Sequence, residues 1–471
     1  MSALSGLLPR ARLGFALPPP FPSRRSGTRA LGRASHVALR RRVATMTTAL
    51  SSSSLHDVVV VGNGPIGSAV ARHVAETGAS VLVVDGKRTL TSASDDMGRI
   101  VRPLDAEGRK SWTDLNVASI DAFPAIEAAS GVTFFRRCGS LACGTPSFVE
   151  KPAARLSEAG AAFDRLDSGA AVAAAFPFLS VPDSHVAVSD QVGGFVDPHR
   201  MIEAQNALTF AAGDRNEVVM EAATEIREDA DGGATVITAE GGERRARAVV
   251  LAGGSYTTYL AAASGFTVVA PPAPDVDRSG VGSIRLSRRT VLLAEVTEAE
   301  ARGALAKMPT VKYQFSPPAA EGNDDARAGG NSHSRNEAMS VYVLPPIEYP
   351  GPDPPRGWYV KIGGGANDFF GRERWSETVA DLDAWMKSDG DDAVADRLHD
   401  VLLSLMPRTN FLSLISKPCV TTCTDDGELQ VETMGANRAV IAVGGCQGKA
   451  AGPADAVGKF VATEVSRTLG R

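Results

Sequence analysis

The sequence contains no long hydrophobic run. A membrane-spanning helix needs ~20 consecutive apolar residues, and the nearest candidates are short runs such as residues 58–61, which are typical of buried strands. Of the 471 residues, 44% are apolar and 22% are charged, which indicates a globular protein of two or three structural units. We therefore expect no membrane span, and the sequence shows no internal repeat.

Acidic residues are missing from the first 54 residues, which also lack lysine but hold nine arginines and nine serines. This composition is typical of organelle import sequences, and Asp57, the first acidic residue, marks the expected start of the fold. We expect a disordered import sequence over residues 1–54 and a location in the mitochondrion or chloroplast rather than in the peroxisome or cytoplasm. A disordered leader without a targeting role is the alternative.

Basic residues are in the minority over the rest of the chain. Without the nine N-terminal arginines, 40 basic residues stand against 54 acidic ones, which gives a net charge of −14. An acidic protein repels nucleic acid. We therefore expect no nucleic acid as a partner.

Cysteine is scarce. Cys138, Cys143, Cys419, Cys423 and Cys446 form an odd and sparse set, unlike a disulfide framework. The spacings 138/143 and 419/423 differ from the C-x-x-C of common zinc sites, and no histidine lies close by in the sequence. We expect no metal site.

A glycine-rich turn follows the first expected strand. Residues 57–61 form a β-branched run suited to a strand buried on both faces. Gly62 permits a tight turn, Gly64 lets backbone N–H groups approach a pyrophosphate, and Gly67 allows a helix to pack closely on the strand. A G-x-G-x-x-G motif alone is weak evidence for a dinucleotide site, so the elements on either side of it decide whether it indicates one.

Those flanking elements predict a dinucleotide-binding fold. Ile66, Val70 and Val74 repeat every four residues, which predicts an amphipathic helix whose N-terminus faces the phosphates. Residues 80–86 predict a second strand that ends at Asp85, 18 residues after the last glycine of the motif. A carboxylate at this place can accept hydrogen bonds from a ribose.

The position of the motif favours FAD over a nicotinamide cofactor. The motif starts the folded part and occurs once, and residues 246–260 hold a distant apolar strand that ends in two glycines. This pattern is common in two-domain flavoproteins, whereas a nicotinamide enzyme more often continues in contiguous β-α units. An NAD-dependent dehydrogenase is the alternative.

The order of the elements predicts an α/β fold, in which a discontinuous, Rossmann-like FAD-binding domain is interrupted by a β-rich (α+β) substrate domain. Helices are expected at 111–130, 153–179, 198–213 and 453–469, and helical patterns alternate over 376–406. Strands are expected at 134–145, 289–299, 339–345, 358–365 and 439–445. Residues 344–357 predict a proline-rich connection, and residues 319–338 predict a disordered surface loop. The FAD-binding domain is expected at 55–137, 192–262 and 412–471, and the substrate domain at 138–191 and 263–411.

The segment Arg99-Ile100-Val101-Arg102 follows the second expected strand. With the later segments GGFVDPHRM, VVLAGGSY, YVLPP, VKIGGG, KPCVTTCTDDG and AVIAVGGCQG, it resembles the sarcosine oxidase and N-methyltryptophan oxidase group of the D-amino-acid-oxidase-like (DAO) flavoproteins. The resemblance spans roughly residues 55–465. It implies an FAD-dependent enzyme that oxidises the C–N bond of a secondary amine or N-methyl amino acid and passes the electrons to O2, giving H2O2.

The resemblance implies roles for four side chains. It places Arg102 at a substrate carboxylate, which a guanidinium binds in bidentate fashion, Arg99 near the flavin, and Tyr342 beside the substrate. Lys361 stands among apolar residues and glycines in WYVKIGGG, where a charge is costly unless it is used. It matches a family lysine that promotes the reaction of reduced flavin with oxygen, because a positive charge stabilises superoxide. An outward-facing strand lysine is the alternative for Lys361. The alternative for the arginines is a salt bridge with a nearby acid: Asp95, Asp96 or Asp105.

Cys419 matches the cysteine that carries FAD through a thioether in sarcosine-oxidase-like proteins, with a buried free cysteine as the alternative. The cofactor-binding residues that we expect are Gly62, Gly64, Pro65, Ile66, Gly67, Asp85, Ser94, Arg99, Cys419, Gly444, Gly445 and Gly448.

Three positions depart from the family pattern. Gly365 stands where the family has a histidine four residues after the oxygen lysine, and Pro103 replaces a histidine after the second arginine. Gly452 stands where the family has a lysine for the substrate carboxylate, and the nearest lysine is Lys449. These departures put sarcosine itself in doubt and leave a larger or less anionic amine open.

We expect a small-molecule amine and O2 as partners, and a monomer. Two other functions stay open at this point. One is an FAD-dependent dehydrogenase that passes electrons to a carrier protein or quinone, and the other is a non-catalytic flavin-binding assembly factor. Fold alone does not decide among them.

Overall fold

The structure, a computed structural model, describes residues 55–86, 92–105, 107–266, 284–315, 339–364, 376, 378–424 and 426–471. The expected import sequence and the expected loop at 319–338 lie outside these residues. None of the helices in the described ranges is long and apolar enough to cross a membrane.

The first sheet is built from strands that are far apart in the sequence. Its parallel strands are β1 (His56–Val61), β2 (Val81–Val84), β9 (Glu217–Val219), β12 (Glu243–Leu251) and β19 (Val440–Gly444). Its antiparallel strands are β10 (Ala223–Glu228), β11 (Ala234–Thr238) and β18 (Gln430–Met434). The distant strand β12 pairs directly with β1, as expected.

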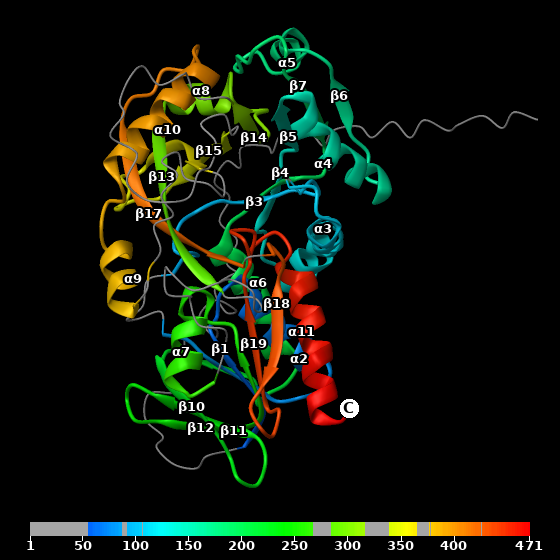
Figure 1. The fold of residues 1–471 in the computed structure, drawn as a ribbon, viewed down its shortest axis with the longest axis vertical. Helices are drawn as coiled ribbons and strands as arrows, with labels where there is room; N and C mark the ends of the chain where they lie inside the picture. Colours follow the sequence, from blue (N-terminus) through cyan, green and yellow to red (C-terminus); the bar gives the residue numbers. More distant parts are fainter. Residues whose placement is uncertain are drawn as a thin grey trace, which may run out of the picture. The chain divides into compact units, whose positions relative to one another are not determined.

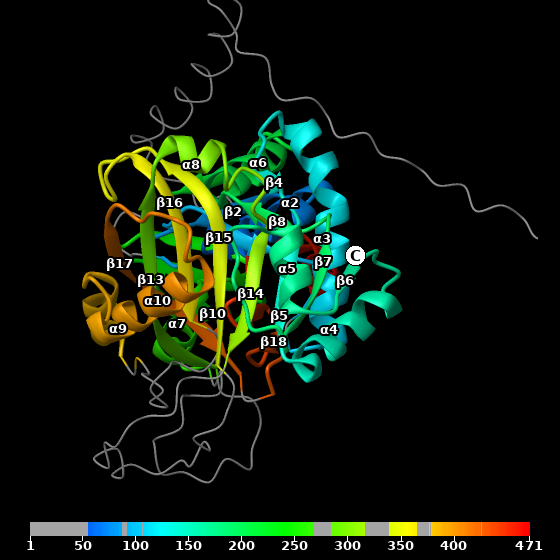
Figure 2. The same cartoon turned by 90° about the horizontal axis from the view of Figure 1, so that it is seen from above.

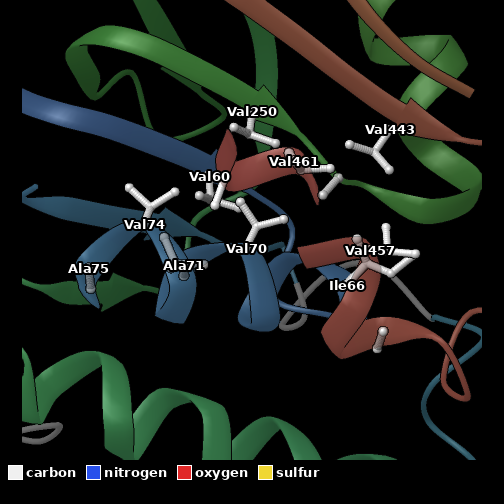
Figure 3. Packing of buried hydrophobic residues seen from close by; sticks show 14 of the residues in the cluster. Val60, Ile66, Val70, Ala71, Val74, Ala75, Val250, Val443, Val457 and Val461 are labelled. Atoms are coloured by element: carbon white, nitrogen blue, oxygen red, sulfur yellow. The ribbon is translucent and has the colours of Figure 1, made fainter. Parts of the chain in front are cut away.

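Helices α2 (Pro65–Glu76), α3 (Lys110–Ser130), α6 (Pro198–Ala211) and α11 (Ala454–Leu469) cover one face of this sheet. Side chains alternate along β1: Val58 and Val60 pack against these helices, whereas Val59 and Val61 pack on the other face with α7 (Thr257–Ala263). Figure 3 shows the valines of α2 and α11 meeting those of the strands. β1 is therefore buried on both faces, as its sequence predicts, and its end carries the glycine turn.

The second sheet has the strand order β17-β13-β16-β15-β14-β5-β7-β6, which can be followed in Figure 2, while Figure 1 shows the same molecule from the side. These strands are β5 (Ser140–Gly144), β6 (Asp164–Leu166), β7 (Val186–Asp190), β13 (Arg285–Val296), β14 (Thr310–Phe315), β15 (Met339–Tyr349), β16 (Gly357–Gly364) and β17 (Leu414–Cys423). One face packs on α10 (Asp392–Leu405) through apolar side chains. Side chains on the opposite face line the cavity described below.

A small antiparallel sheet has the order β3-β8-β4. Its strands are β3 (Arg99–Val101), β4 (Phe135–Arg137) and β8 (Gly194–Val196). The remaining helices are α4 (Pro146–Glu158), α5 (Gly169–Ala175), α8 (Glu298–Arg302), α9 (Val379–Met386) and the 3-10 helix Gly254–Tyr256.

The expected fold class is confirmed, but three local expectations need correction. The span 153–179, expected as one helix, holds the end of α4, then β6 and α5, because Gly160 follows α4 at φ +70° and β6 pairs with β7. Residues 344–349 continue β15, since Pro345 and Pro346 lie at a register shift where the strand skips ladder pairing. The span 134–145, expected as one strand, holds β4 and β5, which belong to different sheets and are separated by Gly139 at φ +83°. β17 lies in the segment 412–471 and pairs with β13 of the second sheet, and the domain boundaries stay a prediction.

Candidate active site

A cavity of about 950 Å³ lies between the glycine turn of the first sheet and one face of the second sheet. Its size is that of a cofactor or ligand site. Its lining includes Lys361, Arg99, Arg102, Tyr342 and Cys419. The structure thus brings together in one cavity five residues that lie up to 320 positions apart in the sequence.

The glycine turn shapes one end of the cavity. Gly62 has φ +100°, and a Cβ there would lie 2.5 Å from the carbonyl oxygen of Ala252. A Cβ on Gly67 would lie 1.9 Å from the carbonyl oxygen of Gly62, so this glycine allows α2 to approach the turn. Gly64 is different, because a Cβ on it would meet no atom closer than the hydroxyl oxygen of Ser94, at 3.8 Å.

The N-terminus of α2 opens into the cavity. Gly64 is its N-cap residue, has no side-chain capping bond, and lines the cavity together with Pro65 and Ile66. Helix N-termini carry unpaired N–H donors and a partial positive charge, which suits a pyrophosphate. The buried Oδ1 of Asn63, also at this wall, has no hydrogen-bond partner among the described residues.

Further expected cofactor residues lie around the same end: Asp85, Ser94, Gly444 and Gly448 line the cavity. Gly67 and Gly445 are not among the lining residues. Gly445 has φ +72° and shapes the turn behind the wall. The glycine cradle, the open helix N-terminus and the carboxylate at the end of β2 fit FAD.

The cavity face of the second sheet is defined by strand register. Arg289 pairs with Cys419, Val291 pairs with Gly363, Gly363 pairs with Tyr342, and Tyr342 pairs with Lys312. Directly paired residues point to the same face of a sheet. Neighbours along each strand, such as Val360 and Ile362 beside the lysine of β16, belong to the core on the other face.

Lys361 is buried at this face, with 2% of its surface exposed. Its ammonium donates hydrogen bonds to Asp96 Oδ2 (2.6 Å) and to the carbonyl oxygens of Met97 (2.9 Å) and Gly98 (2.7 Å). Burial lowers the pKa of Lys361 to about 8, although the carboxylate of Asp96 opposes the shift. The lysine therefore faces the cavity rather than solvent.

Arg99 shares the carboxylate of Asp96 with Lys361. Its Nη1 donates to Asp96 Oδ2 at 3.1 Å and to the carbonyl oxygen of Gly98 at 3.0 Å, and its Nη2 donates to the carbonyl oxygen of Ala93. Burial would raise the pKa of Asp96, but the ammonium of Lys361 and the guanidinium of Arg99 outweigh it and lower that pKa well below its usual range. The salt bridge between Arg99 and Asp96 that the sequence offered as an alternative exists, and it lies in the cavity wall. Because two cations, Arg99 and Lys361, share this one carboxylate, a net charge of about +1 remains there.

Arg102 lines the cavity without a hydrogen bond or ion pair to any described residue. Burial lowers its pKa, which the carboxylates of Glu107, Asp105 and Asp190 oppose from a distance. A guanidinium with all its donors available is suited to a carboxylate ligand.

Lys449 is already neutralised. Its ammonium donates to Asp105 and, at 2.6 Å, to Glu107 Oε2, and it lies 5.2 Å from the ring centre of Trp112. A Cβ on Gly452 would lie 2.7 Å from Asn116 Oδ1, so a side chain at this position would require the Asn116 amide to move. Lys449 lines the cavity, but its charge is balanced by the chain itself.

Sequence reasoning missed Lys312, which lines the cavity and is 6% exposed. The signal that pointed to Lys361, a lysine in an otherwise apolar strand, is present here too, in the stretch TVKYQF. Asp96 was considered only as a salt-bridge partner of the arginines, whereas it joins both Arg99 and Lys361 in the cavity wall.

A dinucleotide-binding turn that faces a charged second sheet across one cavity suits an oxidoreductase that holds a dinucleotide beside its substrate. The chain belongs to the FAD-dependent oxidoreductase (DAO) family, which it matches over residues 57–464. N-methyl-L-tryptophan oxidases of Yersinia pestis (strain Pestoides F) and Yersinia pseudotuberculosis (serotype O:1b, strain IP 31758) are 23% identical over 202 residues, which is 42% of this chain and 53% of each relative. The match thus spans about half the length of these curated relatives.

Solved structures with the same fold cover most of the chain. NikD, an unusual amino acid oxidase essential for nikkomycin biosynthesis, is 20% identical with a TM-score of 0.62, covering 87% of this chain and 93% of its own. Glycine oxidase from Geobacillus kaustophilus is 16% identical with a TM-score of 0.61, covering 88% and 95%. L-proline dehydrogenase from P. horikoshii is 14% identical with a TM-score of 0.63, covering 88% and 94%. At these identities the likeness concerns the fold, which oxidases and a dehydrogenase share.

Proposed function

We propose that this protein oxidises the C–N bond of a secondary amine or N-methyl amino acid and is reoxidised by O2 with formation of H2O2. The observation that carries this proposal is the buried Lys361, held in the wall of the cavity that the glycine turn opens into. A buried lysine is costly unless its charge is used. Here its charge lies beside the expected site of electron transfer.

Each residue of the cavity has its own role in this proposal. FAD, when bound, would accept the hydride that leaves the substrate carbon. The turn at Gly64 and the carboxylate of Asp85 would hold the pyrophosphate and ribose. Arg102 would orient the substrate, and Tyr342, whose pKa burial raises well above its usual range, would stay neutral beside it. Lys361 and Arg99, with only Asp96 between them, would provide positive charge for the reduction of O2.

The full chain, purified with FAD, should be mixed without oxygen with a panel of N-methyl amino acids, cyclic imino acids, primary amino acids and uncharged amines. We expect one class to bleach the flavin absorbance, and we expect air to restore it while H2O2 forms. Bleaching followed by slow reoxidation in air and fast reoxidation by a quinone would favour the dehydrogenase. A flavin that no amine reduces would contradict both and favour the assembly factor.

We further propose that Cys419 carries FAD covalently. Cys419 lies on β17 and lines the cavity, where it pairs in register with Arg289 of β13. The yellow colour is expected to stay with the polypeptide after acid denaturation and to be released in Cys419→Ser. Cys423→Ser is the matched control, since this cysteine lies on the same face of the same strand and should keep the colour. Colour that washes off the unmodified protein would contradict the linkage.

A further inference from the structure

Gly363 lies at a place in β16 where the backbone itself does not require glycine. It is paired on both sides, with Val291 of β13 and with Tyr342 of β15, and its φ is not positive. Glycine in the interior of a strand weakens the strand, and it often marks a site where another group approaches closely. The reason for this glycine therefore lies in what surrounds it.

The ring of Tyr342 fills the space that a side chain at position 363 would need. A Cβ on Gly363 would lie 2.4 Å from Oη of Tyr342, 2.5 Å from its Cζ and 2.7 Å from its Cε1. Because these three distances are nearly equal, the missing Cβ would meet the face of the ring rather than its edge. The tyrosine side chain thus crosses from β15 and lies flat over the backbone of β16.

The flat ring forms part of the cavity floor. Tyr342 lines the cavity, whereas the buried Gly363 is not among the lining residues, so the ring covers the glycine. Val291, which pairs with Gly363 on the other side, lines the cavity again. Lys361 lies two residues before Gly363 on the same face of β16, about 7 Å along the strand. The ring therefore lies beside the lysine that is expected to act on O2.

The hydroxyl of Tyr342 makes no hydrogen bond with any residue that the structure describes. The neighbouring Tyr349 differs, because its hydroxyl donates to Asp96 Oδ1 at 2.8 Å. A hydroxyl removed from water without a partner costs free energy. The Tyr342 hydroxyl is therefore available to a ligand that enters the cavity.

We propose that Gly363 is a positioning residue for the oxidation. By lacking a side chain it lets Tyr342 lie flat, and it thereby sets the height of the cavity floor and the place of the hydroxyl beside the substrate. This inference rests on the proposed function, which assigns a substrate contact to Tyr342.

Alanine at position 363 would displace the ring rather than the strand. The obstacle to the new Cβ is the end of a side chain, whereas β16 is held by β13 and β15 on its two sides. Carbon atoms in contact lie about 3.5 Å apart, so the ring has to move by about 1 Å. The only open direction is away from the sheet, into the space of the substrate.

The test is a mutant cycle on the reduction of the flavin in the absence of oxygen. The holoenzyme is mixed with the amine of the panel that bleaches the unmodified protein fastest. Gly363→Ala is expected to lower the rate constant for bleaching about 10- to 100-fold, since a misplacement of about 1 Å can cost this much. In Tyr342→Phe, which keeps the ring, the alanine should cause a similar further loss.

Tyr342→Ala is the decisive background, because it has no ring to displace. There Gly363→Ala should change the rate constant by less than about twofold, as expected when one residue acts only through the other. An equal loss with and without the ring would overturn the inference. So would an unchanged rate constant in Gly363→Ala alone.

Reoxidation by air shows whether the strand itself has moved. Lys361 lies on the same strand, so Gly363→Ala should retain FAD and reoxidise within about twofold of the unmodified rate constant if β16 stays in place. Ile362→Val is the matched control: it changes the next residue of β16, on the opposite face, and should alter neither half-reaction. Equal slowing of reduction and reoxidation in Gly363→Ala would indicate a displaced strand and overturn the inference.

Crystal structures of the holoenzyme and of Gly363→Ala give a readout that needs no substrate. The Tyr342 ring is expected to lie at least about 1 Å further from the backbone of β16 in the variant, with that backbone in place. A ring that keeps its place while β16 shifts would overturn the inference. Failure of the proposed function looks different: no amine would bleach even the unmodified protein, while the ring would still move in the crystals.

Discussion

Lys361→Met is expected to slow the reoxidation of the reduced protein by O2 about 10²- to 10³-fold, a loss of the size seen when one preorganised donor of an oxyanion hole is removed. In the cavity wall, Lys361 and Arg99 share the single carboxylate of Asp96. Removing the lysine leaves one guanidinium against one carboxylate and cancels the net positive charge. The measurement is stopped-flow mixing of substrate-reduced protein with oxygenated buffer, followed by flavin absorbance.

The same reaction should depend on pH. With a pKa of about 8, Lys361 is mostly protonated at pH 7 and mostly neutral at pH 9, so the rate constant for reoxidation should fall about tenfold between them. The charged groups that act on Lys361 are Asp96 and Arg99. Lys361→Met should show no such fall. A reoxidation rate constant that rises with pH would contradict the role of the protonated Lys361 ammonium in the reaction with O2.

Reduction of the flavin by substrate is the internal control for both experiments. It should change much less than reoxidation in Lys361→Met, because substrate contacts are assigned to Arg102 and Tyr342. Equal losses in both half-reactions would mean that the lysine mainly holds the segment of Met97 and Gly98 in place through its hydrogen bonds.

Alanine at two glycines of the same turn should give opposite outcomes. Gly67→Ala should lower the free energy of unfolding of the cofactor-free protein by about 3 kcal/mol, since its Cβ would lie 1.9 Å from the carbonyl oxygen of Gly62. Gly64→Ala should change that free energy by less than about 0.5 kcal/mol, because Gly64 has φ −74° and space around its Cβ. It should instead weaken FAD binding about 10- to 100-fold, because the methyl group would occupy the approach of the pyrophosphate.

Both variants are best measured in the Cys419→Ser background, where FAD can dissociate and its affinity is an equilibrium quantity. Urea unfolding of the cofactor-free proteins gives the stabilities, and FAD titration gives the affinities. If Gly64→Ala binds FAD as the parent does, the pyrophosphate does not lie against this turn.

The nucleotide end of the cavity could be predicted because its signals are local. The β-branched strand, the glycines, the helix and Asp85 follow one another within about 30 residues, and each residue type is needed by the backbone or the ligand at its own position. Lys361 could be identified for a similar reason, because strand alternation makes one lysine among apolar neighbours stand out. Lys312 carried the same signal and was missed.

Secondary structure predicted from residue composition was less reliable where pairing between distant segments decides which element forms. The alanine-rich span 153–179 favours helix by propensity, yet pairing with β7 makes strand β6 within it. The prolines at 345 and 346 predict a connection, yet a register shift lets β15 continue through them.

By itself, the sequence determined the nucleotide-binding turn, the strand burial around it and the residue types of the site. Only the tertiary structure decided which charges are already balanced. Lys449 meets Asp105 across 344 positions of the chain, whereas Arg102 and Lys312 meet no carboxylate at bonding distance in the described residues. The physical reason is that a charge is balanced by what lies within a few ångströms, and the register of distant strands, not local sequence, sets those distances.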